Sequence, residues 1–283
     1  MSKKITESSK GKTSRFGREN LGSNPSSVAK GKVVFFTVAD NKNLHHAQAL
    51  INSIRKFYTE EELPILVFGE EVLNSIQDPE KFYKQKPLFG LPLLDQYDLV
   101  IGGDADMICL GRFDHIINDD SYDVGAVLNF NRVDLKQYGP ITFSPIDPTE
   151  YLNCGLVAMR SKPFVQHWLN LCNGPYFQRL QYREQDLLNI LAHFGDYRAK
   201  CFDHKQPDGS VLWNGLISKG EYHRTELRNG EVWLPASEDQ YPIEDVRLTF
   251  IHNAGGQGEK KVLDSFRVYF PEAVADHIHK LIQ

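Results

Sequence analysis

Short apolar strands, each followed by a segment with helical spacing, are the feature that most constrains the fold of this chain. Residues 33–38 form an almost continuous β-rich apolar run, residues 43–58 keep helical spacing, and residues 64–69 are again strand-like. A strand without alternating polar residues is buried on both faces, as in a parallel sheet covered by helices. This order predicts an α/β fold with a mostly parallel sheet flanked by helices.

The same pattern continues through the middle of the chain. Further strand-like runs follow at residues 99–101, 123–129 and 151–160, and one more segment with helical spacing follows at residues 162–172. Residues 211–251 are richer in glycine, tryptophan and tyrosine and predict a less regular C-terminal third. No internal repeat or linker is visible, so residues 31–283 are expected to form a single Rossmann-like domain.

Charge is distributed unevenly along the chain. Residues 1–32 carry eight lysines and arginines against two glutamates, a net charge of +6, whereas the whole chain has a net charge of -5. The remainder is therefore close to -11, and an acidic body of this kind argues against nucleic acid as substrate or partner. Residues 1–30 are rich in serine, glycine and lysine, which predicts a disordered basic tail. We interpret this tail as a solubilising extension, with electrostatic attachment to an anionic surface as the alternative.

Hydropathy and cysteine usage bear on where the protein resides. No run approaches the roughly 18 apolar residues that a membrane span needs, and the polar start MSKKITESSK lacks an apolar signal region. A cytoplasmic protein without a transmembrane segment is therefore expected. The four cysteines lie far apart without a C-x-x-C pair, so each is expected to be an ordinary buried thiol.

Two carboxylates follow the apolar run at 99–101, in the stretch DLVIGGDADMICLG. Asp104 and Asp106 flank Ala105 at the expected C-terminal end of the strand, which is the edge of an α/β sheet where ligands bind. Side chains at positions i and i+2 of an extended segment project the same way, so both carboxylates can reach one divalent cation. An EF-hand loop is excluded because apolar residues follow, and no G-x-G-x-x-G or P-loop pattern is present.

A second group of candidate residues comes nearly 150 residues later, in RLTFIHNAGGQGEKK. A predicted strand delivers His252 into a glycine-rich loop that is followed by Lys260 and Lys261. An imidazole together with two carboxylates suits Mn²⁺, with Mg²⁺ as the alternative. Glycine N–H groups can approach a diphosphate, and a lysine beyond them can neutralise a leaving phosphate.

Two further segments place polar groups next to apolar runs. In YREQDLLNILAHF the apolar residues form a buried helical stripe, which leaves Glu184, Gln185 and Asp186 in the first turn. By itself this is an ordinary acidic start of a helix. In YLNCGLVAMR, Asn153 and Gly155 open an apolar run and indicate a turn followed by a strand.

Taken in order, these four segments resemble the GT-A fold nucleotide-sugar glycosyltransferases. The resemblance is strongest to glycosyltransferase family 8, the group of glycogenin and the bacterial lipopolysaccharide galactosyl- and glucosyltransferases. It extends over most of residues 33–261 and is carried by residues 97–106, 152–157, 184–189 and 252–255. The ordered set is much more specific than any one of its members.

The resemblance implies roles for individual residues. Asp104, Asp106 and His252 are implied as metal ligands, and Gln185 is implied to face the anomeric carbon of the sugar. The other residues implied at catalytic and sugar-binding positions are Glu184, Asp186, Asn153 and Gly155. The residues implied to contact the nucleotide, beside the two aspartates, are Thr37, Ala39, Asp40, Asn41, Lys86, Ala105, Gly255, Gly258 and Lys260. Gly258 stands where the family has its diphosphate lysine.

With this resemblance, the sequence predicts a metal-dependent transferase that uses Mn²⁺ or Mg²⁺. It would move a hexose from a nucleotide-diphosphate sugar, expected to be a UDP-sugar, to a hydroxyl of a glycan, lipid-linked or protein acceptor. Retention of the anomeric configuration is implied, whereas an inverting enzyme would use Glu184 or Asp186 as general base. The other alternative is a catalytically silent sugar-nucleotide or glycan-binding module, and the intact set Asp104, Asp106 and His252 argues against it.

Overall fold

The computed structural model describes residues 31–129, 135–147, 150–203, 222–237, 245–252 and 267–283. The basic tail predicted at residues 1–30 lies outside this part of the chain. Within the described residues, no helix is both long enough and apolar enough to cross a membrane.

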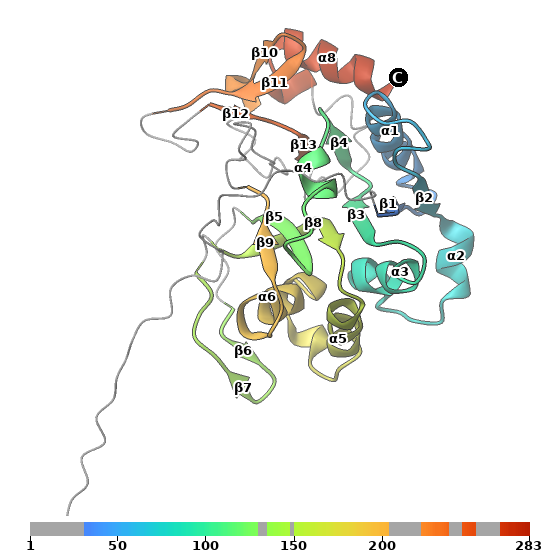
Figure 1. The fold of residues 1–283 in the computed structure, drawn as a ribbon, viewed down its shortest axis with the longest axis vertical. Helices are drawn as coiled ribbons and strands as arrows, with labels where there is room; N and C mark the ends of the chain where they lie inside the picture. The colour runs from blue at the N-terminus through green and yellow to red at the C-terminus, as the bar shows by residue number, and fades with distance from the viewer. Residues whose placement is uncertain (1–30, 130–134, 148–149, 204–221, 238–244, 253–266) are drawn as a thin grey trace, which may run out of the picture.

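A six-stranded sheet with the order β2-β1-β3-β8-β5-β9 forms the centre of the molecule (Figure 1). Its strands are β1 (Val33–Val38), β2 (Ile65–Phe68), β3 (Leu99–Asp104), β5 (Val124–Leu128), β8 (Leu152–Met159) and β9 (Ala199–Cys201). All pairs are parallel except those of β8 with β3 and β5, so β8 alone runs against the other strands. The predicted mostly parallel sheet flanked by helices is confirmed.

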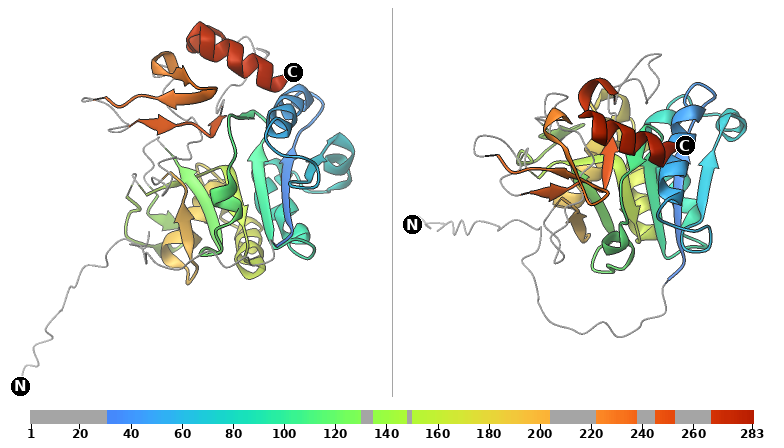
Figure 2. Two further views of the ribbon diagram at one scale, coloured as in Figure 1. Left: turned by 45° about the horizontal axis from the view of Figure 1, so that its top comes forward. Right: turned by 90° about the horizontal axis from the view of Figure 1, so that it is seen from above.

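Helices cover both faces of this sheet (Figures 1 and 2). The α-helices within the described residues are α1 (Leu44–Arg55), α2 (Glu70–Ser75), α3 (Gln85–Leu93), α4 (Asp114–Ile117), α5 (Lys162–Cys172), α6 (Glu184–Phe194) and α8 (Glu272–Ile282). The 3-10 turns in the same part of the chain are η1 (Lys81–Tyr83), η2 (Phe177–Arg179) and η3 (Tyr222–Arg224). Helices α3, α5 and α6 pack together on one face of the sheet, and α1 lies on the other.

The continuous apolar strands are explained by a core on each side of the sheet. In β1, Phe36 packs with Trp168 and Leu188 in the core under α5 and α6. Its neighbour Phe35 belongs to the opposite core, which contains Leu50 of α1. Both phenylalanines are fully buried, so this strand has no solvent face on which polar residues could alternate.

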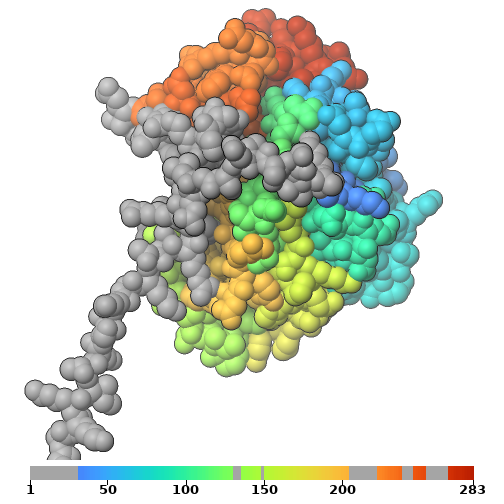
Figure 3. Space-filling model, viewed as in Figure 1, coloured from blue at the N-terminus to red at the C-terminus, as the bar shows by residue number. Residues whose placement is uncertain are grey.

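The C-terminal elements form a second layer beside α1 (Figures 2 and 3). Strands β10 (Glu226–Arg228), β11 (Glu231–Leu234) and β12 (Val246–Arg247) make an antiparallel sheet, and α8 packs against β10 and α1. Two short strand pairs are β4 (Met107–Cys109) with β13 (Phe250–His252), and β6 (Gln137–Tyr138) with β7 (Ile141–Thr142). The sequence analysis assigned no helix to α8, although Val274, Ile278 and Leu281 form its buried stripe.

The strand predicted at residues 99–101 is confirmed as part of β3, which continues through both glycines and ends at Asp104. The turn expected at Asn153 and Gly155 was wrong, because both residues lie inside β8. The register of β8 with β5 shifts between Ala126 and Val127, and this irregularity depends on the neighbouring strand, which a local sequence pattern does not contain.

Replacing Gly103 by alanine is expected to destabilise the fold. The new Cβ would lie 2.4 Å from Cζ of the buried Phe35 ring, which would have to move. Overpacking of this kind costs about 1–3 kcal/mol of unfolding free energy. Urea unfolding of Gly103→Ala measures the loss, with Gly111→Ala as the matched control, because its Cβ would meet no atom within 4 Å. Equal unfolding free energies for the two variants would contradict this packing.

Candidate functional site

The candidate site begins where β1 and β3 end at the same edge of the sheet. In their parallel register Val38 pairs with Asp104, so the last residues of the two strands lie side by side. A tight turn through Ala105 and Asp106 then leads into β4. Asp104 and Asp106 therefore lie at the carboxyl end of parallel strands, where open α/β sheets bind ligands.

His252 reaches the same place through the pairing of β13 with β4. The two strands run antiparallel, and His252 lies opposite Met107, the residue that follows Asp106. The imidazole Nε2 is 3.1 Å from Asp106 Oδ1 and 3.4 Å from Asp104 Oδ2. One potential ligand atom from each of the three residues lies within 4.8 Å of the others. The arrangement fits a single metal ion, since two carboxylates and one imidazole are ligands that Mn²⁺ accepts.

Gly155 of β8 makes room for this imidazole. A Cβ at this position would lie 2.5 Å from both Cε1 and Nδ1 of His252. The imidazole thus presents Nε2 to the carboxylates and its opposite side to β8. Its buried Nδ1 has no hydrogen-bond partner within the part of the chain that the structure describes. The structure places Gly155 behind His252, a role that the sequence analysis did not anticipate.

The two carboxylates determine the charge of His252. Burial acts to lower the pKa of His252, but Asp106 and Asp104 outweigh it and raise this pKa to about 10. Without a metal ion, the site therefore holds an imidazolium between two carboxylates at neutral pH. A cation that binds all three residues must displace the proton, because only neutral imidazole is a metal ligand.

Lys86 brings a second positive charge to Asp104. This lysine lies on α3, is 1% exposed, and forms an ion pair with Oδ1 of Asp104. Burial acts to lower the pKa of Lys86, but Asp104 and Glu184 raise it overall. For Asp104, burial acts in the opposite direction and would raise the pKa. The charge of Lys86 and the contact with His252 outweigh burial and hold the pKa of Asp104 below its usual range. Asp104 is consequently ionised throughout the physiological pH range.

The three polar residues at the start of α6 have different surroundings. Glu184 accepts a hydrogen bond of 3.3 Å from the backbone N–H of Lys86, and burial raises the pKa of Glu184 to about 8. Asp186 is 1% exposed and accepts a hydrogen bond of 2.5 Å from the Tyr151 hydroxyl. Of the three, only Glu184 and Gln185 line the pocket at the sheet edge.

This pocket has a volume of about 670 Å³ and also contains Asp104, Ala105 and Asp106 in its lining. The sequence analysis missed the residues that complete its walls. These include Val38 of β1, Asn43 at the N-cap of α1 and His46 of α1, together with Phe82, Tyr83 and Arg183 from η1 and the loop before α6. The adjacent histidines at 45–46 and the adjacent aromatic residues at 82–83 are the signals in the sequence that could have indicated them.

Four residues expected to contact the nucleotide lie at the end of β1 and in the loop that follows it: Thr37, Ala39, Asp40 and Asn41. Thr37 and Ala39 are buried, and the Thr37 hydroxyl finds no hydrogen-bond partner among the described residues. Asp40 accepts a hydrogen bond of 3.0 Å from the backbone N–H of Asn43 and holds the turn into α1. The backbone N–H of Asn41 donates to a glutamate of α2. Asn43, rather than these four residues, contributes to the pocket lining.

Asn153 does not belong to the pocket lining, and a second group of predicted residues cannot be compared with it. Asn153 is behind Gln185, where its Nδ2 donates to Gln185 Oε1 at 3.0 Å and to Asn129 Oδ1 at 3.2 Å. The residues expected at the diphosphate, Gly255, Gly258, Lys260 and Lys261, lie outside the described residues. Asp104, Ala105, Asp106, Lys86, Glu184, Gln185 and His252 are thus the predicted residues that the structure brings together.

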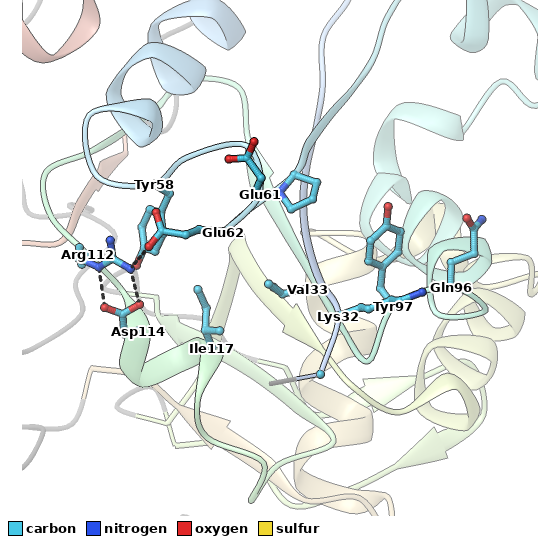
Figure 4. Close-up of a pocket in the computed structure, with 12 residues that line it drawn as sticks. Lys32, Val33, Tyr58, Glu61, Glu62, Gln96, Tyr97, Arg112, Asp114 and Ile117 are labelled. Atoms are coloured by element: carbon cyan, nitrogen blue, oxygen red, sulfur yellow. Dashed lines mark hydrogen bonds and ion pairs between the residues drawn. The ribbon is translucent and has the colours of Figure 1, made fainter. Parts of the chain in front are cut away.

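A second pocket, of about 560 Å³, lies near the start of β1 (Figure 4). Its most prominent cation, Arg112, is already bound by Asp114 at 2.7 Å and by Glu62 at 3.2 Å. Residues Lys32 and Val33 place this pocket at the opposite end of β1 from the metal-ligand cluster. We therefore assign the candidate site to the pocket at the carboxyl end of the strands.

Comparison with known proteins gives matches of fold but not of sequence. No protein-family model and no curated protein sequence matches the chain. Among solved structures, the galactosyltransferase LgtC in complex with donor and acceptor sugar analogues is similar, with 13% identity and a TM-score of 0.52. That match covers 88% of this chain and 95% of LgtC. An active-site glutamine-to-glutamate variant of LgtC gives a TM-score of 0.53 at 14% identity, covering 88% of this chain and 94% of the variant.

The bifunctional glycosyltransferase WbbM is also similar, with 15% identity and a TM-score of 0.51 over 90% of this chain. This chain spans about half of WbbM, covering 52% of it. The chain has the GT-A glycosyltransferase fold. The expected fold is therefore confirmed, and the Asp104, Asp106 and His252 cluster lies at the carboxyl edge of the sheet, where open α/β sheets bind ligands.

In the metal-free GT-A chain, His252 is expected to keep its proton well above neutral pH. Its folded-state pKa of about 10 exceeds the unfolded value of about 6.5. Protonation therefore stabilises the fold fully below pH of about 6.5, and this contribution is lost as the pH rises through the folded pKa. NMR titration of the imidazole in EDTA measures the folded pKa, with His252→Gln identifying the signal. Asp106→Asn should lower this pKa, and an ordinary value in the wild type would contradict the geometry.

Proposed function

We propose that this protein is a metal-dependent glycosyltransferase that transfers a hexose from a UDP-sugar to an acceptor hydroxyl. One observation carries the proposal: a GT-A fold presents Asp104, Asp106 and His252 as a convergent cluster in a pocket at the carboxyl edge of its sheet. LgtC, which shares this fold, was solved with donor and acceptor sugar analogues. This similarity supports a nucleotide-sugar donor and a glycan acceptor for this chain.

The three residues fit a hard divalent cation. Two carboxylate oxygens and one imidazole nitrogen favour Mn²⁺, and Mg²⁺ is the second choice. When bound, such an ion neutralises the negative charge that a leaving nucleoside diphosphate develops. The space left by Gly155 accommodates the imidazole with its Nε2 facing the carboxylates.

The other residues of the site would support Asp104 and bind the donor. Lys86 holds Asp104 in place through its buried ion pair. Asn43, at the N-cap of α1, and His46 of α1 form one part of the pocket wall and would approach the nucleotide. Phe82 and Tyr83 form another part and offer aromatic surface against which sugar rings can pack.

Retention of configuration is the proposed stereochemical outcome. An inverting transferase needs an accessible carboxylate base at the acceptor hydroxyl. Asp186 is buried and bonded to Tyr151, and Glu184 has a pKa raised to about 8, so it is largely protonated at neutral pH. Asp186 is therefore disfavoured as a base, and only the ionised minority of Glu184 is available for this role at neutral pH. A silent binding module is also disfavoured, because binding alone does not require the complete set of metal-ligating residues.

The function is tested with a panel of nucleotide sugars and Mn²⁺. We expect a UDP-hexose to raise the unfolding temperature, because a ligand at 100 times its Kd stabilises a protein by about 2.7 kcal/mol. We also expect the bound donor to be turned over, with NMR showing a first-formed product in the α configuration of the donor. Asp106→Asn should fold normally and lose both effects, because one ligand of the cation is neutralised.

The matched control is Asp120→Asn, which neutralises an exposed aspartate outside the pocket lining and should retain both effects. Equal stabilisation by UDP-hexose with and without Mn²⁺ in the wild type would contradict metal dependence. A β-configured product from an α-linked donor would refute retention. Stabilisation without any turnover would favour the silent binding module.

A further inference from the structure

Three backbone N–H groups of β8 donate to side-chain amides instead of to a neighbouring strand. The pairing of β8 with β3 begins only at Leu156, so the first half of β8 lacks a partner on that side. The three donors and their acceptors are Leu152 N–H to Asn189 Oδ1 at 2.6 Å, Cys154 N–H to Gln185 Oε1 at 2.9 Å, and Gly155 N–H to Asn153 Oδ1 at 2.7 Å. Gln185 and Asn189, one turn apart on α6, thereby replace part of a missing strand.

These bonds fix which end of the Gln185 amide points at β8. A backbone N–H can only donate, so the amide atom that faces Cys154 N–H must be the oxygen. The same oxygen accepts a second hydrogen bond of 3.0 Å from Asn153 Nδ2. Gly155 N–H donates to the other amide atom of Asn153, which must therefore be the oxygen. The atom of Asn153 that faces Gln185 is consequently the nitrogen. Both lone pairs of the Gln185 oxygen are therefore used within the protein.

The NH2 group is the end of Gln185 that remains for a ligand. Gln185 lines the pocket although it is only 8% exposed. Its NH2 group offers two donors. The nearby Tyr151 hydroxyl gives its own proton to Asp186 at 2.5 Å and can accept one of them. Burial raises the pKa of Tyr151, and the Gln185 amide acts against this, which agrees with an N–H directed at that hydroxyl. One donor is left for the pocket.

We propose that Gln185 has two roles: its oxygen holds β8, and its NH2 donates a hydrogen bond to a hydroxyl oxygen of the donor sugar. The proposal rests on the transferase function and gives Gln185 a role different from that of an oxygen nucleophile. For Oε1 to attack the anomeric carbon, it would have to leave Cys154 N–H and Asn153 Nδ2. That movement would strand a buried N–H without a partner, which is unfavourable.

Two substitutions separate the two ends of the amide. Gln185→Glu keeps an oxygen for Cys154 N–H, whereas Gln185→Leu keeps none. We expect Gln185→Leu to lower the thermal unfolding midpoint by at least about 3 °C, and Gln185→Glu to lie closer to the wild type. Asn189→Ala removes the equivalent bond to Leu152 one turn away and should also lower the midpoint. A wild-type midpoint for Gln185→Leu would overturn the scaffold role.

A transfer assay tests whether the Gln185 NH2 binds the donor. It measures transfer of hexose from UDP-hexose with Mn²⁺ above neutral pH. Gln185→Glu lacks the donor, so kcat/KM should fall about tenfold although its stability is largely restored. Asn189→Ala, which does not line the pocket, should stay within a few-fold of the wild type. Wild-type kcat/KM in Gln185→Glu, or a hexose-mass adduct on residue 185 in intact-protein mass spectrometry, would overturn the proposal.

Failure of this proposal is distinguishable from failure of the proposed function. The unfolding midpoints need no substrate, so they decide the orientation of the Gln185 amide independently. Absence of turnover by the wild type with every nucleotide sugar would contradict both the transferase function and the donor role of the NH2. Turnover by the wild type that is retained in Gln185→Glu would contradict the donor role alone.

Discussion

The pairing of β13 with β4 is the interaction on which the candidate site depends. β4 continues directly from the turn that carries Asp104 and Asp106, and its pairing with β13 places His252 opposite Met107. The backbone hydrogen bonds that hold this pair therefore also set the distance between imidazole and carboxylates. The pair is anchored by the fully buried Ile108 and Ile251 in the core beneath α8. The C-terminal layer thus forms part of the candidate site, because it supplies His252, the third candidate ligand.

Compensation of charge is the second constraint on this site. Without a cation, the carboxylates of Asp104 and Asp106 are balanced by the buried Lys86 and by the proton on His252. The pKa of His252 is about 10 for this reason. In the proposed function, a cation that binds the cluster would replace that proton, because only neutral imidazole is a metal ligand. Cation affinity should therefore rise with pH across the neutral range.

The sequence predicted the central sheet because uninterrupted apolar strands such as β1 can only be buried on both faces. It also predicted that Asp104 and Asp106 project from a strand end. It did not predict that Gly155 makes space for His252, because that contact joins residues far apart in the chain. The sequence did not predict the orientation of Gln185 either. That orientation depends on a backbone N–H group that donates to the Gln185 side chain near an irregularity in the pairing of β8. Local patterns do not carry such long-range constraints.

Pulsed EPR of the Mn²⁺-loaded protein tests the central claim most directly. A single site formed by Asp104, Asp106 and His252 predicts one bound Mn²⁺ per chain with hyperfine coupling to an imidazole ¹⁴N. This coupling should disappear in His252→Gln, and it should weaken or vanish in Gly155→Ala, whose Cβ would displace the imidazole. Absence of bound Mn²⁺, or bound Mn²⁺ without nitrogen coupling in the wild type, would contradict the account.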